Sequence, residues 1–178
     1  MDPIPSSSNA NSKVTAQKSI IAANVDQYLT FQLASQNYGV EILRVQEIKG
    51  WEKPTRLPHS PDHVQGVINL RGAVVPILDL RQRFGLGETE YGRTTVVIVV
   101  KVDTPRGELT AGIVVDGVCE VCNISAEDLR PPPEVGSAID TDFVRGLAMV
   151  GEQMLILLDV VRLVGSTLSD TATAPKAA

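Results

Sequence analysis

The sequence predicts a mainly β protein built from two small five-stranded β-barrel subdomains with short helices. Hydrophobic residues make up 43% of the 178 residues but aromatic residues only 4%, so the apolar content is largely valine, isoleucine, leucine and alanine. Many of the apolar runs are rich in valine, which favours strands. Segments of the first half recur in the second half, which indicates two related units.

The two ends of the chain are predicted to lie outside the folded body. Residues 1–25 are rich in serine, asparagine, alanine and lysine without a hydrophobic period, which is typical of a disordered arm. Residues 166–178 are predicted to form a flexible tail. The folded body is therefore expected to span residues 26–165.

The first half of the body is predicted to form strands joined by turns. Two strands within 28–42 flank a turn at Ser35–Asn37, a proline-containing connection at 57–64 has one helical turn begun by Ser60, and two further strands, 66–70 and 73–80, are separated by Arg71 and Gly72. Residues 42–51 fit either a short helix or a bent strand.

The second half continues with strands and ends in a helix. The predicted elements are a strand at 94–102, a strand at 108–121 kinked at Asp116–Gly117, a short helix capped by Ser125 and ended by the prolines 131–133, a hairpin of 143–150 and 153–160 about Gly151–Glu152, and a closing helix over 159–165 with Gly165 as its stop.

Three segments of the chain repeat in the same order. Gly39–Ile48 matches Gly112–Val121 without a gap, Arg71-Gly72 recurs as Arg145-Gly146, and ILDLRQRF at 77–84 recurs as LLDVVRLV at 157–164, which aligns Asp79 with Asp159. Two related units of about 70 residues, each forming one barrel, are the simplest account of this order.

Four of these segments carry a resemblance to a known family. YGVEILRVQEIKG, GVINLRGAVVPILDLRQRFGL, TTVVIVV and GIVVDGV together resemble the CheW-like domain family of bacterial chemotaxis, from about residue 28 to residue 165. The resemblance implies two Src-homology-3-like (SH3-like) β-barrels. It also implies a non-catalytic adaptor that bridges the cytoplasmic tip of methyl-accepting chemoreceptors to the regulatory domain of the histidine kinase CheA.

The length of the chain narrows this expectation. It is too short for a kinase core or an added receiver domain, which favours the family's stand-alone adaptor. A paralogue or a CheV-type scaffold of a non-flagellar pathway stays open, because the partner decides between them. We expect a cytoplasmic protein that is a monomer in isolation and carries no cofactor.

The resemblance also implies a set of contact positions. The residues that match family positions for receptor or kinase contact are Val45, Glu47, Gly66, Asn69, Arg71, Val96, Gly112 and Val121. Several of them also fit a core or turn role, whereas Glu47 is expected to be exposed and to offer a charge to a receptor helix.

Arg71 has two interpretations. Its guanidinium could pair with a carboxylate of a partner, since arginine binds carboxylates in a bidentate geometry. Alternatively, it begins a turn with Gly72 and pairs internally with Asp79, which the repeat at Arg145-Gly146 would support. The two roles are compatible.

The strand predicted at 73–80 is apolar on both faces. Val75 and Ile77 point one way and Val74 and Leu78 the other. A small barrel has one inside face, so the outward side chains must meet the other subdomain, a covering helix or a partner. Pro76 lacks an N–H and is expected at a sheet edge or a bulge.

A zinc- or thiol-dependent redox sensor is the alternative from another class. Cys119 and Cys122 form C-x-x-C, and His59 and His63 form H-x3-H, which together have the ligand types of a Cys2His2 zinc site. Residues three apart in a strand face opposite sides, and Pro61 hinders a helix through the histidines. Two buried cysteines and two loop histidines are therefore expected, with no metal.

Other function classes lack their signatures. The formal net charge is −5 and no basic run exceeds two residues, which argues against nucleic-acid binding. No apolar run reaches the ~18 residues that span a bilayer, and the N-terminus has no secretory signal. The sequence contains no GxSxG, P-loop or GxGxxG motif, so no enzymatic activity is expected.

Overall fold

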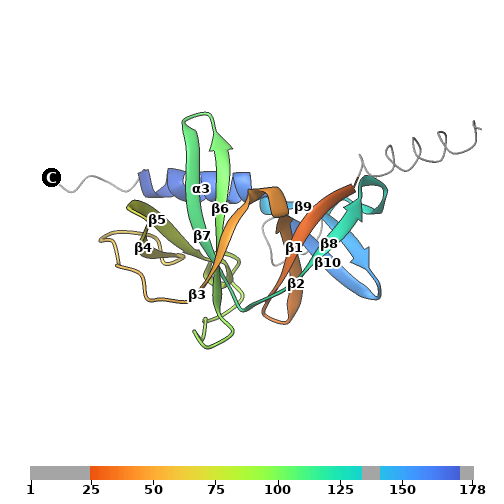
Figure 1. The fold of residues 1–178 in the computed structure, drawn as a ribbon, viewed down its shortest axis with the longest axis horizontal. Helices are drawn as coiled ribbons and strands as arrows, with labels where there is room; N and C mark the ends of the chain where they lie inside the picture. The colour runs from red at the N-terminus through yellow and green to blue at the C-terminus, as the bar shows by residue number, and fades with distance from the viewer. Residues whose placement is uncertain (1–24, 134–140, 173–178) are drawn as a thin grey trace, which may run out of the picture.

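Two five-stranded sheets form the body of the protein. A computed structural model describes residues 25–133 and 141–172 (Figure 1). Apart from Val25, which begins the first strand, the predicted arm over 1–25 lies outside these residues. The mainly β prediction is confirmed, and in Figure 1 the two sheets lie side by side, one on the right and one on the left.

The sheets have matching strand orders. Sheet A has the order β8 (Gly117–Ser125), β1 (Val25–Leu33), β2 (Gln36–Glu41), β10 (Gln153–Leu158) and β9 (Val144–Val150). Sheet B has the order β3 (Val45–Gly50), β6 (Val96–Thr104), β7 (Gly107–Val115), β5 (Ala73–Asp79) and β4 (Val64–Leu70). In each sheet one pair is parallel, β2 with β10 and β5 with β7.

The sheets are SH3-like, but they are not closed barrels as the sequence predicted. The edge strands of sheet B, β3 and β4, are not hydrogen-bonded to each other, nor are β8 and β9 of sheet A. A connecting segment instead pairs with one edge strand of each sheet, through the bridges Thr55–Val67 and Arg130–Leu147. These bridges occupy the edges of β4 and β9, which would have to pair with β3 and β8 to close the two barrels.

The repeat is confirmed, but its two units do not each form one sheet. Sheet B is continuous in sequence from β3 to β7, whereas sheet A combines β1 and β2 with β8, β9 and β10. The chain crosses from sheet A to sheet B after β2 and returns after β7. The aligned segments Gly39–Ile48 and Gly112–Val121 contain these two crossings, so each repeat contributes strands to both sheets.

One of the three repeat alignments is wrong. With Asp79 placed on Asp159, Gly66 falls on Gly146 and Arg71 falls on Gly151, the turn residue of the β9–β10 hairpin. Arg71-Gly72 therefore corresponds to Gly151-Glu152 and not to Arg145-Gly146. The turns agree in conformation, since Arg71 has φ 51° and Gly151 has φ 62°.

Paired glycines mark the close approaches of the repeat. A Cβ at Gly39 would lie 2.9 Å from Leu157 Cδ2, and a Cβ at the equivalent Gly112 would lie 2.6 Å from Ile77 Cδ1. These contacts lie in the two parallel pairs, where Gly39 is opposite Leu157 and Gly112 is opposite Ile77. A side chain at either glycine would push the parallel strands apart.

In the described ranges, four short helices lie between strands, and a longer helix follows the last strand. They are the 3-10 turns η1 (Ile42–Arg44), η2 (Ala126–Asp128) and η3 (Thr141–Phe143), and the α-helices α2 (Leu80–Arg83) and α3 (Val160–Ala172). The ambiguous segment 42–51 is thus a 3-10 turn followed by a strand. The predicted cap is confirmed, because Ser125 Oγ accepts a hydrogen bond from the Glu127 N–H.

The end of the last helix was predicted wrongly. Helix α3 continues through Gly165 to Ala172, into the segment 166–178 that was expected to be a tail. The buried Val164 and Thr167 on either side of Gly165 anchor this part of the helix, and α3 packs against β6. Tertiary packing offsets the low helix propensity of one glycine, roughly 1 kcal/mol.

Both faces of the central strands are buried. One cluster fills sheet B with Ile68, Val75, Ile77, Val97, Val99 and Val114, and another fills sheet A with Tyr28, Ile124, Ala148, Leu155 and Leu157. A third cluster takes side chains from both sheets and from α3, including Leu29, Phe31, Ile98, Val100, Leu78 and Leu163. The outward aliphatic side chains therefore largely meet the other sheet.

Pro76 lies inside the sheet, at a place where its missing N–H is tolerated. It pairs with Val67 of β4, and the parallel pairing of β5 with β7 begins one residue later, at Ile77. The prediction of an edge strand is wrong, since β5 lies between β4 and β7. Pro76 nevertheless lies outside the hydrogen-bonded pairing with β7, so an N–H on that side of β5 is not required.

We expect Gly66→Ala to lower the free energy of unfolding by about 3 kcal/mol. Gly66 has φ 138°, and a Cβ there would lie 2.1 Å from the Thr55 carbonyl oxygen, so the Thr55–Val67 bridge would have to break. Urea unfolding followed by circular dichroism measures the effect. Gly50→Ala is the control, because nothing lies within 4 Å of a Cβ at that position. Equal stability of the two variants would contradict the close approach.

Candidate functional site

An ion pair joins the edge strand β3 of sheet B to the turn between β4 and β5. The Arg71 guanidinium lies 2.8 Å from Glu47 Oε2. Glu47 belongs to the edge strand β3, and Arg71 follows β4, the strand at the opposite edge. The predicted internal partner, Asp79, is therefore wrong, and the sequence interval between Glu47 and Arg71 gave no signal for the pair.

The β4–β5 turn holds Arg71 outward. Asn69 Oδ1 accepts a hydrogen bond from the Gly72 N–H at 2.8 Å, and both Arg71 and Gly72 have left-handed backbone conformations, with φ 51° and 87°. The Arg71 side chain is 76% exposed, whereas that of Glu47 is 21% exposed. Glu47 is thus less exposed than expected, and Arg71 presents the charge to solvent.

Exposed apolar side chains lie on the same strand and hairpin as this ion pair. Ile48 is exposed beside Glu47, and Val74 is 72% exposed directly across the hairpin from Asn69. We call the surface formed by Glu47, Ile48, Asn69, Arg71 and Val74 face B. It combines exposed aliphatic groups with one charged pair, a composition found at interfaces with a polar contact.

Sheet A presents the equivalent positions as a second face. In the two repeat alignments, Ile48 corresponds to Val121 and Val74 to Met154, and Met149 lies opposite Met154 across the β9–β10 hairpin. Val121, Met149 and Met154 are each about half exposed, at 48%, 56% and 53%. A small hollow is lined by Met154 of β10 and by Cys119, Glu120 and Cys122 of β8. We call this surface face A.

The other predicted contact residues have different surroundings. Val45 and Val96 are half-buried against the shared cluster between the sheets. Gly66 and Gly112 are buried at close backbone approaches. These four residues therefore have packing roles. Of the other predicted contact residues, Glu47, Asn69 and Arg71 lie on face B and Val121 lies on face A.

Leu43 is an exposed residue that the sequence analysis did not single out. It is 94% exposed in the η1 turn, where the chain crosses between the sheets. Its neighbour Arg44 forms ion pairs with Glu41 at 3.5 Å and with Asp103 at 3.3 Å. The signal in the sequence was the triplet Ile42-Leu43-Arg44. In it, Leu43 lies between a side chain that packs on the shared cluster and one that forms ion pairs.

The second crossing is held by a bidentate ion pair. Arg81 donates three hydrogen bonds of 2.7–3.0 Å to the carboxylate of Asp116, the residue between β7 and β8. The same carboxylate accepts the Ala34 N–H of the β1–β2 turn at 2.9 Å. Hydrogen bonding to Asp116 raises the pKa of the Arg81 guanidinium. This contact ties sheet B to sheet A.

The cysteines and histidines do not form a metal site in the part of the chain that the structure describes. No group of three or more His, Cys, Asp or Glu side chains comes together there. Cys119 is exposed, so the expectation of two buried cysteines is wrong for it, and Cys122 is half-buried. Burial raises the pKa of the Cys122 thiol, as does the charge of Glu120, which disfavours the reactive thiolate.

The buried carboxylate Asp79 has a structural task. Its Oδ1 accepts the Gln82 N–H and caps α2, and its Oδ2 accepts a hydrogen bond from the Tyr91 hydroxyl at 2.7 Å. Tyr91 stacks on Trp51 with ring centroids 4.0 Å apart. The acid therefore fastens a loop to sheet B.

A CheW-like domain model matches residues 27–167 of the chain. The chain belongs to the CheW-like domain family. The chemotaxis protein CheW of Klebsiella aerogenes is 44% identical over 140 residues, which cover 79% of this chain and 82% of that protein. The protein FrzA of Myxococcus xanthus is 31% identical over 133 residues, which cover 74% and 80%.

A solved structure supports the same assignment. The scaffolding protein TtCheW of Thermoanaerobacter tengcongensis superposes with a TM-score of 0.69 and 35% sequence identity, covering 76% of this chain and 84% of that one. The CheW-like family is thus a family of scaffold and adaptor proteins in chemotaxis. Among the described residues of this member, no helix has the length and apolarity to cross a membrane.

We expect the three tyrosines of this CheW-like chain to resist ionisation at pH 10. Burial raises the pKa values of Tyr28 and Tyr38, and burial together with the Asp79 hydrogen bond raises that of Tyr91 strongly. Since the folded state favours the neutral phenols, their contribution to stability is present below the ordinary pKa of about 10 and is lost as pH rises above it.

Tyrosinate absorbance measured against pH tests this expectation, with circular dichroism to follow unfolding. The absorbance should rise together with alkaline unfolding and not before it. Tyr91→Phe should remove the Tyr91 part of the signal. Ordinary titration of a still-folded protein near pH 10 would contradict the burial of these phenols.

Proposed function

We propose that this chain is a non-catalytic adaptor that couples methyl-accepting chemoreceptors to the regulatory domain of the histidine kinase CheA. The observation that carries the proposal is the presence of faces A and B at equivalent positions of the two sheets. An adaptor needs at least two docking surfaces on one rigid body, and membership of the CheW-like family supplies the scaffold role. Its site of action would be the cytoplasm, where the receptor tip and the kinase lie.

The two faces would receive partners of similar shape. Each has exposed aliphatic or methionine side chains at the turn of a hairpin and on an edge strand. A sheet-built partner such as an SH3-like regulatory domain can cover such a surface without inserting a loop. Face B adds the Arg71–Glu47 pair, so it has a polar contact that face A lacks.

The receptor would contact the crossing at η1. Leu43 projects from this turn, flanked by the charges of Glu41, Arg44 and Asp103. A single protruding leucine with charges beside it suits the shallow groove between two helices. Receptor binding at the crossing would act on both sheets, since strands on either side of η1 belong to different sheets.

A paralogue of a non-flagellar pathway is the second candidate. The similarity to FrzA shows that relatives of this chain carry names other than CheW. A CheV-type scaffold has weaker support, since CheV3 of Helicobacter pylori is 22% identical and this chain covers 39% of its length. Binding to the kinase of each pathway separates the candidates. The redox alternative has the raised thiol pKa of Cys122 against it.

We expect Arg71→Ala to weaken binding to the CheA regulatory domain about tenfold or more, the loss of roughly 1.4 kcal/mol. The free energy of unfolding should change by less than about 1 kcal/mol, because the ion pair is largely exposed. Calorimetry measures the affinity and urea titration the stability.

Arg93→Ala is the matched control for this change. Arg93 is an exposed arginine outside face B, without an ion pair to the described residues. Its removal should leave both quantities unchanged. A stability loss of several kcal/mol with unchanged affinity at Arg71→Ala would assign Arg71 to the turn alone. No binding of the folded parent chain to CheA would overturn the coupling function.

We expect the two faces to be separable. Ile48→Glu should remove binding at face B and Val121→Glu at face A, because each buries a new carboxylate against an apolar partner surface. Calorimetric titration with the CheA regulatory domain should show two binding events for the parent chain, one for each single variant and none for the double variant. A single event that survives both substitutions would contradict the two-face arrangement.

A further inference from the structure

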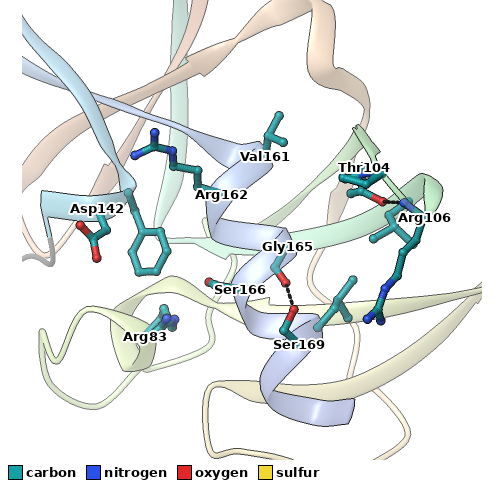
Figure 2. Close-up of a pocket in the computed structure, with 13 residues that line it drawn as sticks. Arg83, Thr104, Arg106, Asp142, Val161, Arg162, Gly165, Ser166 and Ser169 are labelled. Carbon is teal, nitrogen blue, oxygen red and sulfur yellow. Dashed lines mark hydrogen bonds between the residues drawn. The ribbon is translucent and has the colours of Figure 1, made fainter. Parts of the chain in front are cut away.

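A cavity lies along helix α3 and belongs to neither face. It has a volume of about 920 Å³ and is open to solvent on one side. Its walls come from the end of α2, the turn between β6 and β7, the η3 turn and α3 itself (Figure 2). Both repeats therefore contribute to it, and we call it the α3 groove.

Small residues of α3 form the floor of this groove. Gly165 lies at its centre, and a Cβ built there would meet nothing within 4 Å. The hydroxyl groups of Ser166 and Ser169 donate to helix carbonyls at 3.1 and 2.9 Å, so they lie against the helix (Figure 2). The groove is hollow because no large side chain projects from this part of α3.

Apolar side chains cover the walls. Leu109 comes from β7, Phe143 from η3, and Val161 and Leu168 from α3. These residues pack against the shared cluster between the sheets, and Leu109, Val161 and Leu168 remain partly exposed. A ligand that fills the groove would therefore cover apolar surface contiguous with the core.

Two guanidinium groups border this apolar surface, which the carboxylate of Asp142 also lines (Figure 2). Arg83 lies over the Phe143 ring, 4.7 Å from its centroid, and its buried Nε has no hydrogen-bond partner. Arg106 lies at the β6–β7 turn, on the other side of α3 in Figure 2. Neither forms an ion pair within residues 25–133 and 141–172, whereas Arg162 is paired with Asp159 at 3.6 Å.

We propose that the α3 groove is a further docking site, for an acidic amphipathic helix of a partner protein. The apolar face of such a helix would lie on Leu109, Phe143 and Leu168, and its carboxylates would meet Arg83 and Arg106 on either side. The apolar walls decide against a small inorganic anion, which would leave them wet. The site is independent of faces A and B, which contribute no residue to its lining.

Fluorescence anisotropy with a labelled synthetic helix tests the proposal on the full chain. The probe carries leucines at i, i+3, i+4 and i+7 and glutamates on the flanking positions, and the comparison peptide has lysine in place of each glutamate. We expect the glutamate peptide to bind with a roughly micromolar Kd and the lysine peptide at least about tenfold more weakly.

Variants locate the binding. Arg83→Gln with Arg106→Gln should weaken the glutamate peptide about tenfold or more. Gly165→Leu should do the same by filling the groove, while Arg93→Gln should leave the affinity unchanged. Gly165→Leu raises helix propensity, so a melting experiment should show folded protein.

Any one of four results would overturn the proposal. Three of them are absence of glutamate-peptide binding to the parent chain, equal binding of the two peptides, and unchanged binding by the folded Gly165→Leu variant. Complete displacement of the peptide by millimolar inorganic phosphate would also overturn it and would identify a small-anion site. Arg71→Ala leaves the α3 groove intact. The test of CheA binding and the test of peptide binding at the α3 groove can therefore fail independently of each other.

Discussion

The fold depends on two places where an early strand runs parallel to a late one with no room for a side chain between them. Gly39 of β2 lies against Leu157 of β10, and Gly112 of β7 lies against Ile77 of β5. Immediately after each of these glycine-containing strands the chain leaves its sheet for the other. The close contact therefore fixes both the sheet and the point of crossing.

The crossings explain why one rigid body has two equivalent faces. Because each repeat places strands in both sheets, the sheets share a buried cluster and cannot slide apart as separate domains could. The hairpin turns and edge strands at the far ends remain outside this cluster. Their side chains Val74, Met149 and Met154 are accordingly exposed. Faces A and B are thus formed by side chains that the cluster shared by the two sheets does not bury.

Much of this arrangement could be predicted from the sequence. The strands, the hairpin turns and the Ser125 cap follow from local patterns, because alternating apolar residues and turn residues act over a few positions. The repeat predicted two similar units. The sequence could not predict that each repeat contributes strands to both sheets. The same repeat would also be compatible with one complete sheet per repeat. The choice is made by contacts distant in sequence, such as Gly112 with Ile77.

The functional surface was predicted only in part. Arg71, Asn69 and Glu47 were singled out through the family resemblance, but the Glu47–Arg71 pair depends on two strand edges meeting in space. The misalignment of Arg71 with Arg145 arose because an Arg-Gly dipeptide matches by chance. The hairpin register, and not the dipeptide, identifies equivalent residues. The α3 groove was missed because Gly165 was expected to end the helix.

The exchanged strands also determine the order in which the protein can be completed during synthesis. Sheet B is contiguous in sequence and can assemble once β7 has left the ribosome, whereas β1 and β2, made first, lack their neighbours until β8 and β10 are made. Such long-range pairing slows folding. The β1–β2 hairpin therefore waits without its neighbouring strands, and unpaired strand edges of this kind are prone to aggregation.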